Sequence, residues 1–544
     1  MKLHRRTFQI FWDVHAWAGV LAALLLYLMF FAAAFALFHS ELDEWAEPRS
    51  APAAQALPRL QPLFLQLVRE QHALERTSVG FSIHDTTPTA QLRGPGREER
   101  EFRYAPRSQR LEPLRSKLGS FLYELHFLDP IPYGIYVAGV AALVLFLALV
   151  TGVLIHLKDL IRQWFQFRPA HATRTWSSDM HKVLGVFGLP FQLFYAWSGA
   201  VLCLAYVTVQ PVFVAAVFRG DIASANAARG DSEEPPATGK RASELPDLDR
   251  VLGKLRALVP GVSPEYVAIQ NPGDEACVVT VYGTQPQLAF SNVEVSFHAK
   301  DARVLHSSVS SSGAALQRFE AWFYGLHYAQ FGGYGVKWLY ALLALGTCAV
   351  IVTGNLVWLE RRDRTRSRPG NRLLQRLTVG FCSGVPLAVA ALFVANRCLP
   401  AELSRRASVE QAVFWFGLTA ALIWPFWART DRRVAGQQLV LAGALFASAL
   451  FVDLSLRQPF FADSVQRGVA CGLSLLAVSC LAAGTRLLRV GSLQRPSKPN
   501  AATSADSGTL NAYRRGRKGA NRDATEATAD AAKSAPIRSK APVS

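Results

Sequence analysis

Four histidines of this 544-residue chain fall into two pairs of matching positions. His15 lies in the stretch DVHAWAGV and His181 in the similar stretch DMHKVLGV, each at the start of a long apolar run. His126 lies in SFLYELHF and His327 in AWFYGLHY, each shortly before another apolar run. Ionisable side chains within membrane segments are costly and usually functional, and two imidazoles can ligate one haem iron from both faces. We call His15 and His181 the inner pair, His126 and His327 the outer pair, and regard both as candidate haem ligands.

The same segments define an internal repeat. A third pair, TGVLIHLKD from Thr151 and TGNLVWLER from Thr353, closes the apolar runs that follow the two Leu-His motifs. Each copy therefore consists of a helix, an external domain, a Leu-His motif, a helix and a Thr-Gly exit, over about 8–160 and 174–362. The copies run in the same direction, which predicts a pseudo-twofold axis along the membrane normal. Such an axis would bring the two members of each pair to the same membrane depth.

One further histidine complicates the inner pair. His156 ends the second apolar run, where its repeat counterpart is Trp358. It could replace one of the inner pair as a ligand or hydrogen-bond a haem propionate. The absence of a CxxCH motif excludes covalent attachment, so the expected cofactor is haem b, at two sites. The alternative for a histidine near a membrane boundary is a headgroup contact or a helix cap, and we expect Asp13 and Asp179 to be helix N-caps.

Long apolar runs indicate a polytopic membrane protein. About 18 or more apolar residues are needed to cross a hydrocarbon core about 30 Å thick. The expected fold is mainly α, with a four-helix haem-binding bundle built from the duplicated unit and four additional C-terminal transmembrane helices. The first run is too long for a signal peptide, so we expect a retained helix. The eight qualifying segments are 9–38, 132–157, 181–206, 336–358, 377–395, 410–427, 436–455 and 467–488.

The formal net charge of +18 follows membrane topology rather than a nucleic-acid site. Lysines and arginines cluster before the first helix, between the second and third, after the fourth, and between the sixth and seventh. Such clusters mark the cytoplasmic side of a membrane protein. The pattern predicts cytoplasmic termini, periplasmic long loops and a location in a bacterial inner membrane, with the lipid bilayer and no nucleic acid as partner.

The two long loops are too long to be simple connectors. In the second, LPDLDRVLGKLRALV predicts an amphipathic helix, and YVAIQ, CVVTVYG and VEVSFHA predict strands. In the first, LQPLFLQLVREQ predicts a helix, and SVGFSIH and REFRYAP predict strands. The expected division is transmembrane helices at 1–38, 132–157, 181–206 and 336–358, periplasmic α+β domains at 39–131 and 207–335, cytoplasmic loops at 158–180 and 359–376, a four-helix membrane region at 377–490 and a disordered basic tail at 491–544.

In this order the motifs resemble the PepSY-associated transmembrane helix family. The resemblance covers about 5–365 and includes the run HLKDL…FQFR…WSSDMHKVLGV. Characterised members are bacterial inner-membrane reductases that reduce ferric siderophores in the periplasm with haem held in a four-helix bundle. The resemblance implies that His15, His181, His126 and His327 are the haem ligands. The four extra C-terminal helices depart from the family's four-helix form.

Added to the paired histidines, the resemblance implies a haem-containing reductase that passes electrons across the inner membrane to periplasmic ferric-siderophore iron. The chain has no GxGxxG fingerprint, so the expected electron donor is quinol or a cytosolic reductase. The alternative is a periplasmic peptide- or protease-binding regulatory protein without redox activity. A transporter is disfavoured, because the last four helices carry few charges and no histidine, and no clearly discontinuous helix is predicted.

Overall fold

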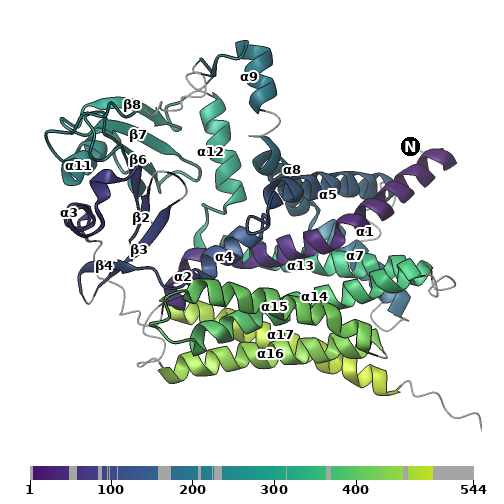
Figure 1. Ribbon diagram of the computed structural model, residues 1–544. Helices are drawn as coiled ribbons and strands as arrows, with labels where there is room; N and C mark the ends of the chain where they lie inside the picture. Colours follow the sequence, from purple (N-terminus) through teal and green to yellow (C-terminus); the bar gives the residue numbers. More distant parts are fainter. Residues whose placement is uncertain are drawn as a thin grey trace, which may run out of the picture. The chain divides into compact units, whose positions relative to one another are not determined.

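The structure is a computed structural model whose elements are mainly helical, with one antiparallel sheet (Figure 1). Residues 494–544 of the predicted tail and most of the predicted loop at 158–180 lie outside the described residues. The described residues are 4–47, 58–83, 88–94, 96, 98–106, 108–156, 173–205, 210–222, 224–225, 236–313, 315–362, 369–428, 430–456 and 464–493.

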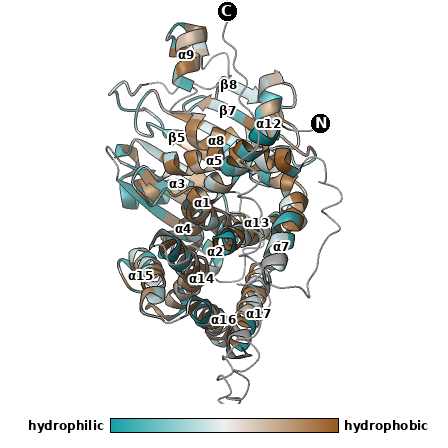
Figure 2. Cartoon of the chain, turned by 90° about the vertical axis from the view of Figure 1, so that its right-hand side faces the viewer, coloured by the Kyte–Doolittle hydropathy of each residue, from teal (hydrophilic) through white to brown (hydrophobic). Residues whose placement is uncertain are grey.

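Seven helices in the described part of the chain are long and apolar enough to cross a membrane. They correspond to seven of the eight predicted segments, and Figure 2 shows apolar residues along α5. Multiple apolar helices of this length make the chain a multi-pass membrane protein. The seven are α1 (Arg5–Ala36), α5 (Gly134–His156), α13 (Gly333–Arg361), α14 (Pro369–Cys398), α15 (Arg406–Trp427), α16 (Asp431–Leu456) and α17 (Ser464–Leu493).

The third predicted span is broken. Two helices, α7 (Thr173–Phe187) and α8 (Leu189–Leu204), meet at an angle of 70° around Gly188. Pro190 lies in the first turn of α8, where its missing N–H costs nothing, but it could not continue the hydrogen-bond ladder of α7. The prediction of one continuous helix over 181–206, and of no discontinuous helix, is therefore wrong.

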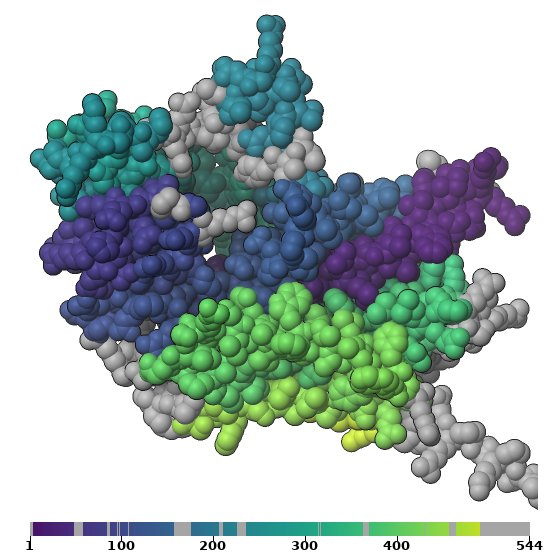
Figure 3. Space-filling model, in the orientation of Figure 1, coloured from purple at the N-terminus to yellow at the C-terminus, as the bar shows by residue number. Residues whose placement is uncertain are grey.

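The helices that carry the histidine motifs form one bundle. The long helix α1 packs against both α5 and α13, while α7 packs against α13 and α8 packs against α5. The remaining spans pack mainly on one another, with α14 against α15 and α16 and touching α1 and α13. Figure 3 shows the surface of α15 and α16 in green. Both groups share one apolar core.

Strands from both long loops join in a single sheet. Its order is β4-β3-β2-β1-β5-β6-β7-β8, and every pairing is antiparallel. The junction pairs β1 with β5, so that Val79 faces Ile269 and Phe81 faces Val267. The strands are β1 (Ser78–Ser82), β2 (Thr89–Arg93), β3 (Glu99–Ala105), β4 (Arg110–Pro113), β5 (Ser263–Gln270), β6 (Val278–Thr284), β7 (Val293–His298) and β8 (Val304–Val309).

Two helices of the long loops pack in the core of the sheet. The amphipathic α3 (Leu60–Gln71) and α11 (Leu248–Leu258) bury most of their leucines in the same core as β1 and β5. The Asp247 side chain caps α11 by accepting from the Arg250 N–H. The sequence predicted both helices and five of the strands, but it placed them in two separate units. The others are α2 (His39–Ala46), η1 (Ala73–Glu75), α4 (Leu118–Leu125), α9 (Gln210–Phe218) and α12 (Ala315–His327).

A cross-link tests the joined sheet. Ser78 of β1 and Gln270 of β5 are register partners, and directly opposed residues of an antiparallel pair lie close enough for a disulfide. We expect Ser78→Cys/Gln270→Cys to form an intramolecular disulfide under mild oxidation, detected by mass spectrometry of the linked peptides. The control, Ser78→Cys/Ser308→Cys, pairs β1 with the far strand β8 and should stay reduced. Cross-linking in the control alone would contradict the strand order.

Candidate haem site

The inner pair comes together in the bundle. His15 of α1 and His181 of α7 have ring centroids 6.2 Å apart and ring planes inclined at 71°. A metal–nitrogen bond of about 2 Å on each side, plus the two ring radii, also separates imidazole centroids by about 6 Å. The spacing therefore fits one metal ion between two imidazoles. The described residues include no group of three or more metal-binding side chains, and an axial haem pair needs only two.

Backbone carbonyls of neighbouring helices fix both inner imidazoles. His15 Nδ1 lies 2.7 Å from the Ala148 carbonyl of α5, and His181 Nδ1 lies 2.9 Å from the Val350 carbonyl of α13. A carbonyl can only accept, so each Nδ1 carries the proton and donates it. Each Nε2 therefore keeps its lone pair, the form in which imidazole binds a metal.

The Thr-Gly motifs explain how each inner imidazole reaches its carbonyl on the neighbouring helix. The Thr151 hydroxyl donates to the same Ala148 carbonyl at 3.0 Å, and the Thr353 hydroxyl donates to the carbonyl that accepts from His181, also at 3.0 Å. A Cβ on Gly152 would lie 3.0 Å from the His15 ring, and a Cβ on Gly354 would lie 3.0 Å from the His181 ring. Glycine is needed at both positions because any side chain would crowd the imidazole.

Glycines one turn beyond the inner pair leave space in the bundle. A Cβ on Gly19 or Gly185 would meet no atom within 4 Å. A planar macrocycle needs such open positions next to its ligands, so these two glycines fit haem. By contrast, a Cβ on Gly188 would lie 2.7 Å from the Gln192 side chain, so Gly188 serves close packing, whereas one on Gly199 would only make an ordinary contact with Ala142 at 3.5 Å.

The other polar residues near the inner pair have different surroundings. His156 ends α5 close enough to His181 to interact electrostatically. The predicted N-caps are wrong, because Asp13 lies inside α1 and Asp179 inside α7. Asp13 is exposed and accepts from the Gln9 side chain, whereas Asp179 is buried.

The outer pair lies at helix ends outside the spanning segments. His126 is the C-cap of α4, and its Nδ1 donates to the Tyr123 carbonyl. His327 ends α12; its Nδ1 lies 2.8 Å from the Ser198 hydroxyl, and its carbonyl accepts from the Tyr195 hydroxyl at 2.7 Å. The second ring nitrogen of His126 thus has a free lone pair, as in the inner pair.

Burial keeps the outer pair uncharged. It lowers the pKa of His126 to about 4 and that of His327 to about 3. Electrostatic interaction with His126 contributes to the lower pKa of His327, and interaction with His39 to that of His126, so these imidazoles are neighbours. At neutral pH both are neutral, which is the protonation state that metal ligation requires.

Sequence reasoning missed several residues around the outer pair. The His39 ring lies 4.9 Å from that of Tyr123, and Tyr123 shares a hydrogen bond with Tyr328. His39 has no counterpart in the second repeat, so a comparison of the copies passes over it. Its position at the end of the first apolar run was the available signal. No sequence pattern marked Ser198 and Tyr195, because their contacts with His327 depend on the packing of α8.

The buried histidines predict an acid-sensitive fold. Between pH 6.5 and about 4 the unfolded chain binds a proton that folded His126 does not, so the free energy of unfolding falls as pH falls. The loss for His126 amounts to about 3 kcal/mol. We expect His126→Gln to flatten the pH dependence of the melting temperature of the haem-free protein in detergent. His72→Gln, at an exposed histidine, is the control and should leave it unchanged. An unaltered slope in His126→Gln would contradict the assignment.

Comparison with known proteins agrees with these motifs. The model of the family described as "PepSY-associated TM region" matches residues 12–361, which contain all four paired histidines. A protein of Pseudomonas aeruginosa, named "Uncharacterized protein PA4219", is 31% identical over 279 residues, which cover 49% of this chain and 68% of that protein. The match extends over more than half of the sequence, and the chain belongs to the PepSY-associated transmembrane family.

Proposed function

We propose that this protein is a haem-containing reductase that passes electrons across the bacterial inner membrane to periplasmic ferric-siderophore iron. The inner pair is the observation that carries the proposal. Its rings are 6.2 Å apart, and each Nδ1 is committed to a backbone carbonyl. Structural histidines need no such opposed arrangement, whereas axial ligation of one iron does.

Haem b bound at the two pairs would supply one-electron carriers whose potentials depend on ligands, hydrogen bonds and burial. The chain provides neutral imidazoles from His15 and His181 on one side of the bundle and from His126 and His327 on the other. The carbonyls of Ala148 and Val350 hold the inner rings in the tautomer that can ligate a metal. His156 would interact with a haem propionate rather than replace an inner ligand, since the two inner rings already lie 6.2 Å apart.

The repeat and its topology belong to the same proposal. Matched Thr-Gly contacts with His15 and His181 support a duplicated unit with a pseudo-twofold axis along the membrane normal. The basic clusters support cytoplasmic termini and a periplasmic sheet. The inner pair thus lies toward the cytoplasm and the outer pair toward the periplasm.

The reaction transfers one electron to each ferric ion and yields a ferrous ion. The lower charge weakens the attraction between iron and the oxygen ligands of the siderophore, which favours release. The electron comes from quinol in the membrane or from a cytosolic reductase. The tyrosines Tyr123 and Tyr328 lie beside the outer pair, where an acceptor would approach.

A regulatory binding protein is the second candidate. Within the described residues the sheet ends in two edge strands, β4 and β8, each paired on one side. Such edges can accept an extended peptide as an additional strand. This function would need no haem, so haem content separates the two candidates.

The first test is the absorption spectrum of the detergent-purified protein, oxidised and then reduced with dithionite, with haem quantified per chain. We expect a b-type spectrum with two haems per chain. His181→Gln should remove about half of the haem, because only the inner site loses a ligand. His72→Gln should retain all of it, since His72 is exposed. A haem-free protein from haem-replete cells would contradict the proposal.

A second test uses the glycines beside the inner pair. We expect Gly152→Leu to displace the His15 ring and to abolish haem binding at the inner site only, because a Cβ there would already lie 3.0 Å from the ring. Haem stoichiometry and a redox titration report the loss. Gly468→Leu is the matched control, a glycine of spanning helix α17 with open space at its Cβ position. Full haem content in Gly152→Leu would contradict the placement of His15 as a ligand.

A further inference from the structure

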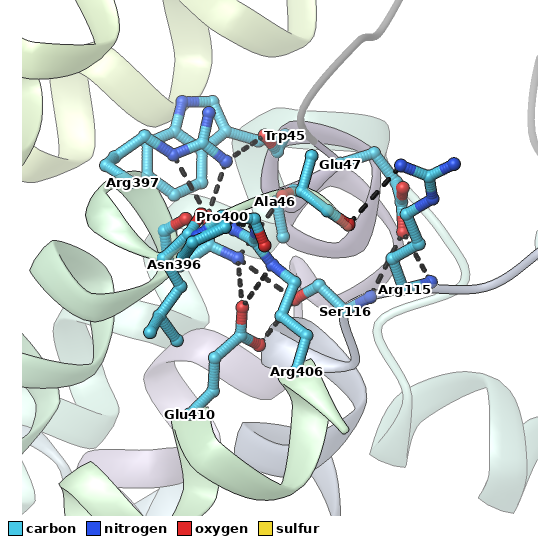
Figure 4. A network of polar contacts seen from close by, with 12 residues as sticks. Trp45, Ala46, Glu47, Arg115, Ser116, Asn396, Arg397, Pro400, Arg406 and Glu410 are labelled. Atoms are coloured by element: carbon cyan, nitrogen blue, oxygen red, sulfur yellow. Dashed lines mark hydrogen bonds and ion pairs between the residues drawn. The ribbon is translucent and has the colours of Figure 1, made fainter. Parts of the chain in front are cut away.

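The C-terminal helices meet the first repeat in a buried polar network (Figure 4). These helices lie beyond the family match, which ends at residue 361. Their partners are α2 and the segment that leads into α4, the helix capped by His126. The residues labelled in Figure 4 are Trp45, Ala46, Glu47, Arg115, Ser116, Asn396, Arg397, Pro400, Arg406 and Glu410.

One half of the network fixes α2. Arg397 of α14 pairs with Asp453 of α16 at 3.1 Å, with side chains only 4% and 6% exposed. The Arg397 guanidinium also donates to the Trp45 carbonyl at 2.7 Å and lies 3.9 Å above the Trp45 ring. The Trp45 indole N–H donates to the other Asp453 oxygen at 3.0 Å. Trp45 thus cannot leave without breaking contacts to both buried charges.

The other half fixes the start of α4. Glu410 of α15 accepts from Arg406 at 3.0 Å and from the Ser116 hydroxyl at 2.7 Å. Asn396 of α14 donates to Glu410, to the Ser116 hydroxyl and to the Ala46 carbonyl. Ser116 lies one residue before the N-cap of α4. The network therefore joins α14 and α15 to both segments of the first repeat at one point.

Direct contacts carry this support from α2 to α4 and along α4. The Asp43 carboxylate of α2 accepts from the Gly119 and Ser120 N–H groups at 2.6 and 2.9 Å, in the first turn of α4. A Cβ on Gly119 would lie 2.0 Å from the His39 carbonyl, so the two helices approach as closely as glycine allows. Phe121 packs edge-on against Phe414 of α15, with ring centroids 5.2 Å apart.

The second repeat holds its outer histidine differently. His327 is fixed by Ser198 and Tyr195, both on α8 of the same repeat. His126 has its Nδ1 bonded within its own helix, to the Tyr123 carbonyl, so its position follows the position of α4. The two members of the outer pair are therefore positioned by different parts of the chain.

We infer that α14, α15 and α16 act as a positioning device for His126, through α2 and α4. This inference rests on the proposed function, in which His126 is a ligand. Arg397, Asp453 and Trp45 are positioning residues, because they act on the ligand only through the helices that they hold. The role of the C-terminal helices is thus to make the outer site of the first repeat rigid.

The test replaces the buried ion pair by apolar residues. Arg397→Met/Asp453→Leu removes both charges of the ion pair together, so the bundle should fold while Trp45 loses its hydrogen bonds to Arg397 and Asp453. Hydrogen–deuterium exchange of the full-length protein reports residues 118–127, with residues 315–327 as the internal reference. We expect exchange at 118–127 to become at least tenfold faster, with no change at 315–327. In the haem-loaded protein, one of two midpoint potentials should shift.

A milder variant and a control keep the outcome decisive. Trp45→Phe removes the indole N–H and one ring of the side chain but leaves both charges in place, and it should give a smaller increase at 118–127 even if the paired variant fails to fold. Gln438→Leu removes buried hydrogen bonds to Ser383 and Ala421, which join the C-terminal helices to one another and not to α2 or α4. This control should leave the exchange at 118–127 unchanged. Unchanged exchange at 118–127 in the folded paired variant, or equal acceleration in Gln438→Leu, overturns the inference. A wild-type protein without haem refutes the proposed function instead, and the exchange result still decides whether these helices hold α4.

Discussion

The N–H group of each buried imidazole must be satisfied without water, and much of the bundle follows from that requirement. A helix in a membrane already uses its carbonyls for its own hydrogen bonds, but each carbonyl oxygen has a second lone pair. His15 and His181 donate to such oxygens on neighbouring helices. The imidazole can reach the carbonyl only where the next helix carries no side chain, which is why Gly152 and Gly354 lie at the contacts.

The outer pair meets the same requirement with other means. Carbonyls in the last turn of a helix lack the usual partner four residues on, and the His126 ring donates to one of them, that of Tyr123, at the C-terminus of α4. His327 has the Ser198 hydroxyl of α8 at 2.8 Å from its Nδ1. A short helix such as α4 is marginal alone and depends on what packs against it. This dependence gives the additional C-terminal helices a physical reason to contact the first repeat.

The sequence predicted the inner pair because two copies of one motif mark equivalent places along the chain. Their meeting at 6.2 Å agrees with that prediction. The sequence could not show which groups hold the rings, because Ser198 and the carbonyl partners belong to other helices and leave no local pattern. The junction of β1 with β5 was hidden for the same reason, since each loop alone has a sensible strand order. His39 was missed because the repeat does not include it.

The break at Gly188 lets one chain segment serve both pairs. Before the break, α7 runs along α13 and places His181 at the Val350 carbonyl. After it, α8 turns by 70°, packs against α5 and presents Ser198 to His327. Gln192, in the first turn of α8, donates to the Thr347 hydroxyl of α13. This bond links α8 to the helix against which α7 packs. In the first repeat α1 remains unbroken, and His126 bonds within its own helix instead. The extra support of α4 is the structural counterpart of that difference.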